Sequence, residues 1–366
     1  MLESLKVIAD KFEIEGEVKD IILFGNGHIN ETYKVFTDKQ MYTLQKINKN
    51  VFPDPAAIME NSVGVTNFLT EKIKARGGDI YRETLHFLKA DGGKYFVIDE
   101  NGDYWRSWIF IDNATAHEVV TGPSMLTESG RAFGDFQRQL ADYPADTLHE
   151  VIKDFHNTPA RFKQLTDAIE ANKSGRKDNC KAEIEFALKR EEAAGELMNL
   201  LNEGKLPLKV THNDTKMSNI LVDDVTNKAV CIIDLDTVMP GLTAFDYGDS
   251  LRAGASTAAE DEADLSKVWF DLELFEAYTK GFLSVAKNAL TEKELETLPV
   301  GAKLMTYEVG IRFLADYING DVYFRTKYPE HNLVRARNQF KLVADMEAHM
   351  DEMNAIVMKY KEKYKN

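Results

Sequence analysis

The residues best suited to chemistry lie in the segment THNDTKMSN, residues 211–219. His212, Asp214 and Asn219 have the H-x-D-x-x-x-x-N spacing of a kinase catalytic loop. Transfer of a phosphoryl group to a hydroxyl needs an acid that accepts the proton of the attacking group and a side-chain oxygen that binds Mg²⁺ on the phosphates. We predict that Asp214 is this base and Asn219 a metal ligand. The alternative is an ordinary polar turn before a strand.

A second acidic segment makes the polar turn the weaker interpretation. The apolar run 229–233 ends in Asp234-Leu235-Asp236, and Asp234 follows Asn219 by fifteen residues. Mg²⁺ is a hard ion that one or two carboxylates bind together with substrate phosphates. Asp234 is therefore predicted as the second metal ligand and Asp236 as a possible third. Two hairpin strands that end side by side would bring Asn219 and Asp234 together.

A glycine-containing loop near the N-terminus could approach phosphates. Glycine allows backbone amides to come close to a phosphate, although G-x-G between strands also fits a plain tight hairpin. Protein kinases have a third glycine where this loop has an asparagine, which tolerates left-handed backbone. The loop is Gly25-Asn26-Gly27-His28-Ile29-Asn30. Its residues Gly25, Asn26 and Gly27 are predicted to bind nucleotide.

In the wider kinase pattern, a lysine on the third strand binds the α- and β-phosphates of the nucleotide. This sequence has Gln45 at that place, and Lys46 one residue later. Strand side chains alternate between faces, so these two should point in opposite directions. Either could contact the nucleotide, and the sequence does not choose between them.

The elements that must position these residues change in character along the chain. Short β-rich runs predict strands at 21–24, 32–36, 42–47, 81–87, 95–99 and 104–111, with a helix over 55–75. Beyond residue 112 helical spacing predominates, interrupted by β-rich runs between 208 and 236. We predict an α+β, bilobal architecture. The small antiparallel β lobe, residues 1–112, contains the glycine loop predicted to bind nucleotide, and the larger helical lobe, residues 113–366, contains the predicted catalytic residues.

The composition narrows the choice of partners. The chain has 366 residues and a net charge of −15, which argues against nucleic acid or an anionic membrane as the main partner. Cys180 and Cys231 form no C-x-x-C pair and are expected to be buried thiols. The N-terminus lacks signal-peptide features, and no apolar run is long enough to span a bilayer. A cytoplasmic location is expected.

Several blocks together resemble the aminoglycoside phosphotransferase and choline kinase superfamily, whose members share the protein-kinase-like fold. More narrowly, nearly the whole chain resembles N-acetylhexosamine 1-kinases. The resemblance is carried by the blocks GNGHIN (25–30), THNDTK (211–216), IIDLDT (232–237), FDYGDS (245–250), GIRFLADY (310–317) and YPEHNLVR (328–335).

The resemblance implies ATP and Mg²⁺ bound between the lobes and transfer of the γ-phosphoryl group to the anomeric hydroxyl of a small sugar. It implies that His28, Arg312 and Tyr323 hold the sugar, and that Asp246 and Asp249 brace the catalytic loop, to which His212 adds structural support. Arg312 and Asp316 are spaced i, i+4 and could alternatively form a surface ion pair that contributes little to stability.

Other interpretations stay open. The acceptor could be choline, an aminoglycoside, homoserine or a neutral hexose. The run Ile232–Val238 also fits the pattern of haloacid-dehalogenase-like phosphatases, with Asp234 as nucleophile, but that pattern leaves His212, Asp214 and Asn219 unexplained. A catalytically silent ATP-binding protein would have lost the base or the metal ligands, and all three are present. The sequence decides neither the preferred hexosamine nor the oligomeric state.

Overall fold

The computed structural model describes residues 2–25 and 29–364. They pack as two compact units, which we describe separately. The first comprises residues 1–116, 142–152 and 219–240, and the second comprises residues 117–141, 153–218 and 241–366. The lobe boundary after residue 112 remains a prediction. The packing groups two later segments, 142–152 and 219–240, with the N-terminal residues.

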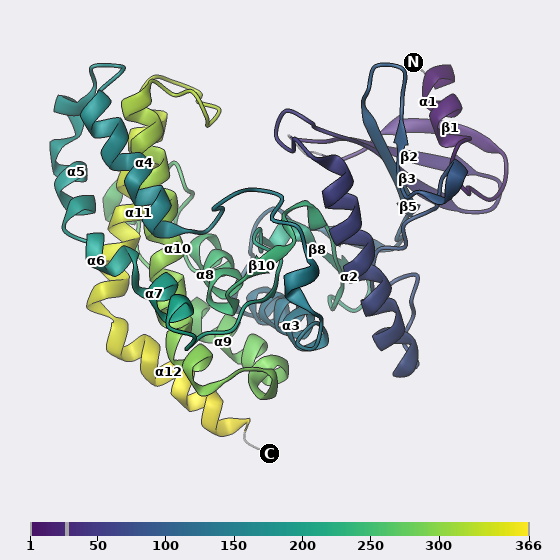
Figure 1. Ribbon diagram of the computed structural model, residues 1–366. Helices are drawn as coiled ribbons and strands as arrows, with labels where there is room; N and C mark the ends of the chain where they lie inside the picture. The colour runs from purple at the N-terminus through teal and green to yellow at the C-terminus, as the bar shows by residue number, and fades with distance from the viewer. Residues whose placement is uncertain (1, 26–28, 365–366) are drawn as a thin grey trace. The chain divides into compact units, whose positions relative to one another are not determined.

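The first unit is built on an antiparallel sheet (Figure 1). Among the described residues its strand order is β1-β2-β3-β5-β4, and in this register Gln45 of β3 lies opposite Arg106 of β5. The strands are β1 (Val18–Leu23), β2 (Glu31–Thr37), β3 (Met41–Ile47), β4 (Val97–Ile98) and β5 (Tyr104–Ile109).

Two helices accompany this sheet. α1 (Leu2–Ala9) packs Leu5 and Ile8 into the same apolar core as the sheet residues Val35, Tyr42 and Leu44. α2 (Pro55–Ala75) begins where Asp54 accepts a hydrogen bond from the Ala57 N–H, with proline at the first helical position.

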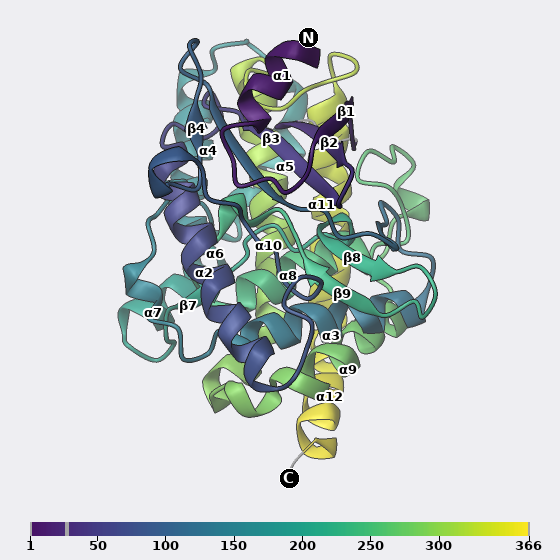
Figure 2. The same ribbon diagram turned by 90° about the vertical axis from the view of Figure 1, so that its right-hand side faces the viewer.

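A second, smaller sheet of the first unit orders its strands β6-β8-β9 within the described residues. Figure 2 shows β8 and β9 as neighbouring strands. These strands are β6 (Ala114–Ala116), β8 (Ile220–Asp223) and β9 (Ala229–Ile232); a 3-10 turn at Leu235–Thr237 and β10 (Met239–Gly241) follow.

One predicted strand is absent. Residues 81–87 form turns, and their β contact is a single bridge between Phe87 and Trp108. The carbonyl of Asp79 accepts hydrogen bonds from the N–H groups of Arg82 and Glu83, so a turn satisfies the backbone groups that a strand would have paired.

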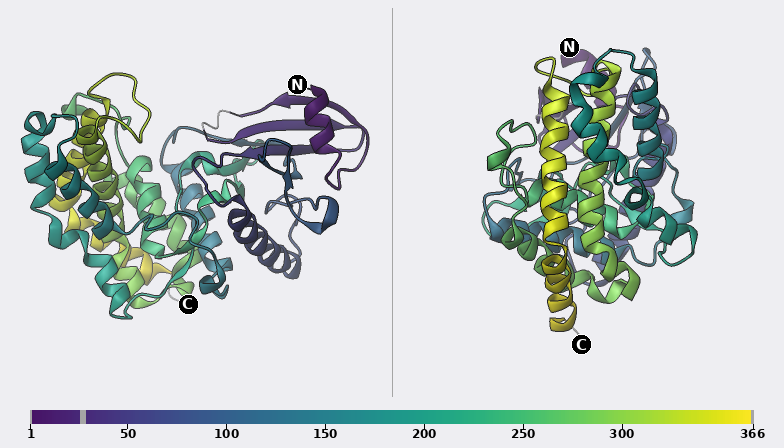
Figure 3. Two further views of the ribbon diagram at one scale, coloured as in Figure 1. Left: turned by 45° about the horizontal axis from the view of Figure 1, so that its top comes forward. Right: turned by 90° about the vertical axis from the view of Figure 1, so that its left-hand side faces the viewer.

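The second unit is mainly helical. Its longest described helices are α10 and α11, which lie side by side, and α12 continues after α11 (Figure 3). The elements are α3 (Pro123–Gln139), α4 (Thr158–Ala171), α5 (Lys181–Leu188), α6 (Glu191–Ala194), α7 (Glu196–Asn202), β7 (Lys209–Thr211), α8 (Thr243–Gly254), α9 (Leu272–Ala286), α10 (Glu292–Asn319), α11 (His331–Ala348) and α12 (Met350–Lys363).

Local sequence explains the main helical contacts. α10 starts in a capping box between Thr291 and Glu294. α3 and α9 cross so closely that a Cβ at Gly281 would lie 1.9 Å from the Thr127 carbonyl oxygen. Met346 of α11 and Met353, Val357 and Tyr360 of α12 are buried in this helical core, and His349 separates the two helices.

Both cysteines are free and buried. In the described part of the chain, no helix is both long and apolar enough to cross a membrane. The architecture is α+β, with an antiparallel sheet in the N-terminal part and a larger helical part.

Candidate active site

The hairpin of β8 and β9 carries Asn219 and Asp234 at its open end. Ile220 pairs with Ile232, and the Ile233 N–H donates a 2.9 Å hydrogen bond to the Asn219 carbonyl. The hairpin thus brings the backbone of Asn219 next to the residue that precedes Asp234. This is the arrangement expected from the sequence for an amide and a carboxylate that share a metal ion.

Asp234 and Asn219 differ in burial. Asp234 is exposed and adopts a left-handed backbone conformation with φ 59°, whereas the Asn219 side chain is buried. A non-glycine residue in this conformation is uncommon and often marks a functional position. Within residues 2–25 and 29–364, no three His, Cys, Asp or Glu side chains converge as a metal site. An amide, a carboxylate and nucleotide phosphates would still suit Mg²⁺, which prefers oxygen ligands and keeps part of its shell for substrate.

Asp236 has a different environment. It is 2% exposed; its Oδ1 lies 2.6 Å from Arg106 Nη2, and its Oδ2 accepts a 2.7 Å hydrogen bond from Asn30 Nδ2. Arg106 is also buried, and it donates through Nε and Nη2 to the Gln45 amide oxygen at 2.9 and 2.6 Å. These contacts occupy the Asp236 carboxylate, so the possible third metal ligand is also a buried counter-ion.

Gln45 and Lys46 point in opposite directions, as strand alternation requires. Gln45 faces Arg106, and its Nε2 donates to Thr32 at 2.7 Å. Lys46 pairs with Glu31 and lies 5.8 Å from the Trp105 ring centre. The hydrogen bond to Glu31 raises the pKa of Lys46. Among the described residues, Arg106 is a cation that contacts Gln45, and no sequence pattern indicated it.

The glycine loop is described only in part. Gly25 adopts φ 83°, which favours glycine, and a Cβ there would meet no atom within 4 Å. Asn26, Gly27 and His28 lie outside the described residues. Asn30, in the place of the third kinase glycine, accepts a 2.9 Å hydrogen bond from the Asn48 N–H while it donates to Asp236.

α2 supports the turn that follows Asp234. Asn61 donates 2.9 Å hydrogen bonds to the carbonyls of Val238 and His149, and Ser62 donates to the Leu235 carbonyl at 3.5 Å. Both side chains are buried. Neither Asn61 nor Ser62 was predicted from the sequence. The feature that could have indicated them is a pair of polar residues on the apolar face of a helix.

In the second unit, α8 holds the predicted catalytic loop (residues 211–216). Asp246 accepts hydrogen bonds from the N–H groups of His212 and Asn213, at 2.9 and 2.8 Å, and from Gln137 Nε2 at 2.7 Å. Burial raises the pKa of Asp246, and these donors oppose that shift. Asp249 accepts a 2.8 Å bond from the Thr215 N–H. These contacts are those of bracing residues.

Asp214 lies between these anchored positions. Its side chain is 34% exposed, and Lys216 Nζ is 2.9 Å from its Oδ2. Its N–H donates to His212 Nδ1 at 3.3 Å, and the buried His212 ring packs edge-on against Phe133 and Phe136. A carboxylate that reaches solvent from a fixed backbone can accept a proton from a bound hydroxyl.

A buried ion pair supports the same loop from the other side of Asn213. His156 Nδ1 is 2.8 Å from Glu308 Oε1, and His156 Nε2 is 3.2 Å from the Asn213 carbonyl oxygen. Thr158 donates to Glu308 Oε2 at 2.7 Å. Burial opposes the charged imidazole, but Glu308 outweighs it and raises the pKa of His156. No sequence pattern indicates this pair, because its members are 152 residues apart.

Arg312 and Tyr323 lie close together in the second unit. The Arg312 guanidinium carbon is 5.7 Å from the ring centres of Tyr323 and Phe155 and 5.5 Å from that of Phe324. Arg312 makes no ion pair with Asp316 among the described residues, since both Asp316 oxygens accept other hydrogen bonds. The surface ion-pair interpretation is therefore wrong.

Asp316 organises the loop that carries Tyr323, residues 320–330. Its carboxylate accepts hydrogen bonds from three successive N–H groups, those of Val322, Tyr323 and Phe324, at 2.8–2.9 Å. Asn332, fully buried at the start of α11, donates to Asp316 at 2.8 Å and to Asp321 at 2.9 Å. The loop therefore has a fixed backbone.

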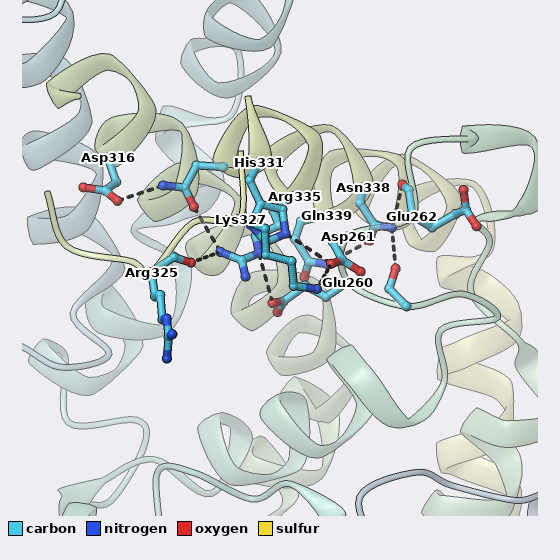
Figure 4. Close-up of polar contacts among 12 residues, drawn as sticks. Glu260, Asp261, Glu262, Asp316, Arg325, Lys327, His331, Arg335, Asn338 and Gln339 are labelled. Carbon is cyan, nitrogen blue, oxygen red and sulfur yellow. Dashed lines mark hydrogen bonds and ion pairs between the residues drawn. The ribbon is translucent and has the colours of Figure 1, made fainter. Parts of the chain in front are cut away.

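The far end of this loop is held by an acidic segment, as Figure 4 shows. Asp261 Oδ2 lies 2.9 Å from Lys327 Nζ and 3.1 Å from His331 Nε2, and the hydrogen bond from Lys327 lowers the pKa of Asp261. Arg335 donates to the Arg325 carbonyl at 3.2 Å. These contacts give the block 328–335 a structural role, which its resemblance to hexosamine enzymes had not explained.

Residues 20–278 match the family described as the phosphotransferase enzyme family, APH. The chain belongs to this family. It is accordingly a small-molecule kinase that phosphorylates a hydroxyl-bearing acceptor, and the predicted superfamily is confirmed.

Solved structures with a similar fold span almost the whole chain. A microcompartment-associated aminopropanol kinase has a TM-score of 0.63 at 14% identity and covers 96% of this chain and 98% of its own. Choline kinase from Cryptosporidium parvum Iowa II has a TM-score of 0.57 at 13% identity, with coverages of 98% and 99%. Spectinomycin phosphotransferase in complex with ADP and spectinomycin has a TM-score of 0.53 at 12% identity, with coverages of 99% and 98%. These likenesses confirm the predicted fold class.

Proposed function

We propose that this kinase phosphorylates an N-acetylhexosamine at its anomeric hydroxyl, using ATP and Mg²⁺, to give the sugar 1-phosphate and ADP. Family membership supports the phosphoryl transfer. The sequence blocks that resemble N-acetylhexosamine 1-kinases support the acceptor. The similar structure that contains ADP supports a purine nucleotide as co-substrate.

The environment of Arg312 is the observation that carries the choice of acceptor. Three aromatic rings surround its guanidinium, and it has no hydrogen-bond or ion-pair partner among the described residues. A guanidinium presents a fork of N–H donors that suits hydroxyl and carbonyl oxygens. Choline and aminoglycosides are cations, and a cation beside Arg312 would be repelled.

In the proposed reaction, Asp214 orients the anomeric hydroxyl and accepts its proton as the hydroxyl oxygen forms a bond to the γ-phosphorus. The bond from that phosphorus to the β,γ-bridging oxygen breaks, and ADP leaves. Asn219 and Asp234 would hold Mg²⁺, which offsets charge on the phosphates when bound. Asp246, Asp249 and the His156–Glu308 pair keep the backbone around Asp214 in place.

The test is an ADP-release screen over N-acetylhexosamines, hexoses, choline, homoserine and aminoglycosides, with the position of the phosphate set by phosphorus NMR. We expect turnover with an N-acetylhexosamine and a 1-phosphate product. Turnover of choline or an aminoglycoside without any sugar product would refute the proposal, and a 6-phosphate product would refute the assigned position.

A further inference from the structure

Two arginines of the second unit flank Phe155 from different helices. Arg161 of α4 donates through Nε and Nη2 to the Phe155 carbonyl at 3.2 and 3.1 Å, and through Nη1 to Gln164 at 3.2 Å. Arg312 of α10 lies 5.7 Å from the ring of the same phenylalanine. The two positive charges therefore gather around one residue.

Neither guanidinium forms an ion pair with a carboxylate within the described part of the chain, although the Glu308 carboxylate attracts both of them electrostatically. Glu308 is bound by His156 and Thr158, and Asp316 is bound by backbone N–H groups and Asn332. Burial, followed by repulsion from Arg312, lowers the pKa of Arg161.

Other partly buried arginines of this unit do form ion pairs with a carboxylate. Arg176 lies 2.5 Å from an Asp321 oxygen, and Arg252 lies 2.6 Å from a Glu260 oxygen. A partly buried charge without an ion-pair partner costs folding free energy. Two such charges at one place therefore indicate a role in choosing the ligand by its charge.

The aromatic residues around Arg312 add to this argument. Rings that face a common space can form a cage for an ammonium ligand. Here the rings of Phe155, Tyr323 and Phe324 already contact a guanidinium. A quaternary or primary ammonium group would lose that cage and meet two like charges instead.

We propose that Arg161 is a specificity-determining residue that acts with Arg312 to exclude ammonium-bearing acceptors, so that an uncharged N-acyl sugar is accepted and the free amino sugar is rejected. This inference rests on the proposed function, because it places the acceptor beside Arg312. Arg161 acts through its charge, and three of its five N–H groups already donate to Phe155 and Gln164. The similar structures include kinases of aminopropanol and choline, so the inference also says how this chain departs from them.

The experiment compares pairs of acceptors that differ in charge; the members of the sugar pair also differ by an acetyl group, whereas those of the choline pair have nearly the same shape. N-acetylglucosamine is paired with glucosamine, and 3,3-dimethylbutan-1-ol, the uncharged isostere of choline, is paired with choline. The value of kcat/KM for each acceptor is measured at saturating Mg·ATP in wild type, Arg161→Gln and Arg161→Lys. Lys163→Gln is the matched control, because it removes an exposed charge from the same helix.

We expect wild type to prefer the uncharged member of each pair that is turned over. Arg161→Gln should reduce that preference by roughly three- to tenfold, the effect of one partly screened charge, by improving the amine. Arg161→Lys and Lys163→Gln should retain it. An unchanged preference in Arg161→Gln would overturn the proposal, as would a wild-type preference for glucosamine or choline. Selective turnover of a neutral hexose would refute the N-acetylhexosamine assignment and leave the charge selection supported.

Discussion

Asn30 donates a 2.7 Å hydrogen bond to Asp236, and this bond joins two residues 206 positions apart in the chain. It connects the end of the glycine loop to the turn that carries Asp234. On its other side Asp236 meets Arg106, which also binds Gln45. Asp236 therefore connects the segment that precedes β2 with β5 and, through Arg106, with β3. This supports an organising role for Asp236 and leaves Asp234 as the exposed acid that we predict to bind the metal.

Replacement of Asp236 should act mainly on stability. Asp236→Asn leaves the buried Arg106 guanidinium without its counter-ion, which we expect to lower the free energy of unfolding by roughly 3–5 kcal/mol. Urea denaturation measures this. The control is Asp234→Asn at the exposed neighbouring acid, for which we expect a change within about 0.5 kcal/mol. Equal stability of the two variants would contradict the assignment of Asp236 as a buried counter-ion.

Replacement of Asp234 should weaken the binding of Mg·ATP. Asp234→Ala removes a predicted oxygen ligand of Mg²⁺, so the affinity for Mg·ATP should fall while that for metal-free ADP changes little. Titration calorimetry with and without Mg²⁺ separates the two effects. If Mg·ATP bound this variant with wild-type affinity, Asp234 would not be a metal ligand.

Replacement of Asp214 should act on turnover. Asp214→Asn keeps the shape of the side chain and removes its capacity to accept a proton, a contribution of roughly 10²–10⁴-fold for general-base catalysis. We expect kcat to fall by about that factor, with ATP affinity nearly intact. Lys216→Gln is a useful comparison, because it removes the cation 2.9 Å from the Asp214 carboxylate and leaves the carboxylate itself in place. Wild-type turnover in Asp214→Asn would exclude Asp214 as the base.

The sequence predicted the parts of the fold and site that depend on local patterns. Asp214 and Asn219 could be proposed from their spacing within one loop, and Asp234 from its place after an apolar strand, whereas the opposed directions of Gln45 and Lys46 followed from strand alternation. Arg106 and Asp236 could not be paired, because their contact depends on the register between β3 and β5 and on a turn far along the chain.

In the second unit, too, contacts between residues far apart in the chain could not be predicted from local patterns. His156 and Glu308 lie on different segments, and neither stands in a motif. The predicted strand at 81–87 failed because β-rich composition does not reveal whether backbone groups find partners in a sheet or in a turn. Asp316 was considered as a partner of Arg312 from helical spacing alone, whereas the backbone N–H groups of its own following loop bind it.

The His156–Glu308 pair should make stability depend on pH. The pKa of His156 is raised above its usual 6.5, so its contribution to stability is complete below that value and is lost as the pH rises through the raised pKa. The pKa of Glu308 is lowered from 4.5, and its contribution is lost only as the pH falls through that lowered value. We expect His156→Gln to destabilise the protein more at about pH 5.5 than at about pH 8.5.

The control for this prediction is His149→Gln. His149 is 48% exposed and pairs with Glu60, which is more exposed still, so its loss should change stability little at either pH. Thermal unfolding of both variants and wild type gives the comparison. A destabilisation by His156→Gln that did not vary with pH would mean that the imidazole is neutral in the folded protein.

A change in the 320–330 loop should affect the KM for the acceptor without affecting the KM for ATP. Asn332 is buried and donates to Asp316, whose carboxylate fixes the backbone N–H of Tyr323. Asn332→Ala should loosen this loop and raise the acceptor KM by roughly tenfold, or about 1.4 kcal/mol, while the KM for ATP stays the same.

Tyr307→Phe is the control for this loop, because it removes a different buried hydrogen bond of the second unit, which Tyr307 of α10 donates to the Ala187 carbonyl at 2.9 Å. Both variants should lose roughly 1–3 kcal/mol of stability, since each leaves a buried polar group without its partner. Only Asn332→Ala should change the acceptor KM, measured at a temperature at which both variants are folded. Equal effects on KM would mean that the loop responds to general destabilisation, and a rise in the KM for ATP would place Tyr323 away from the acceptor.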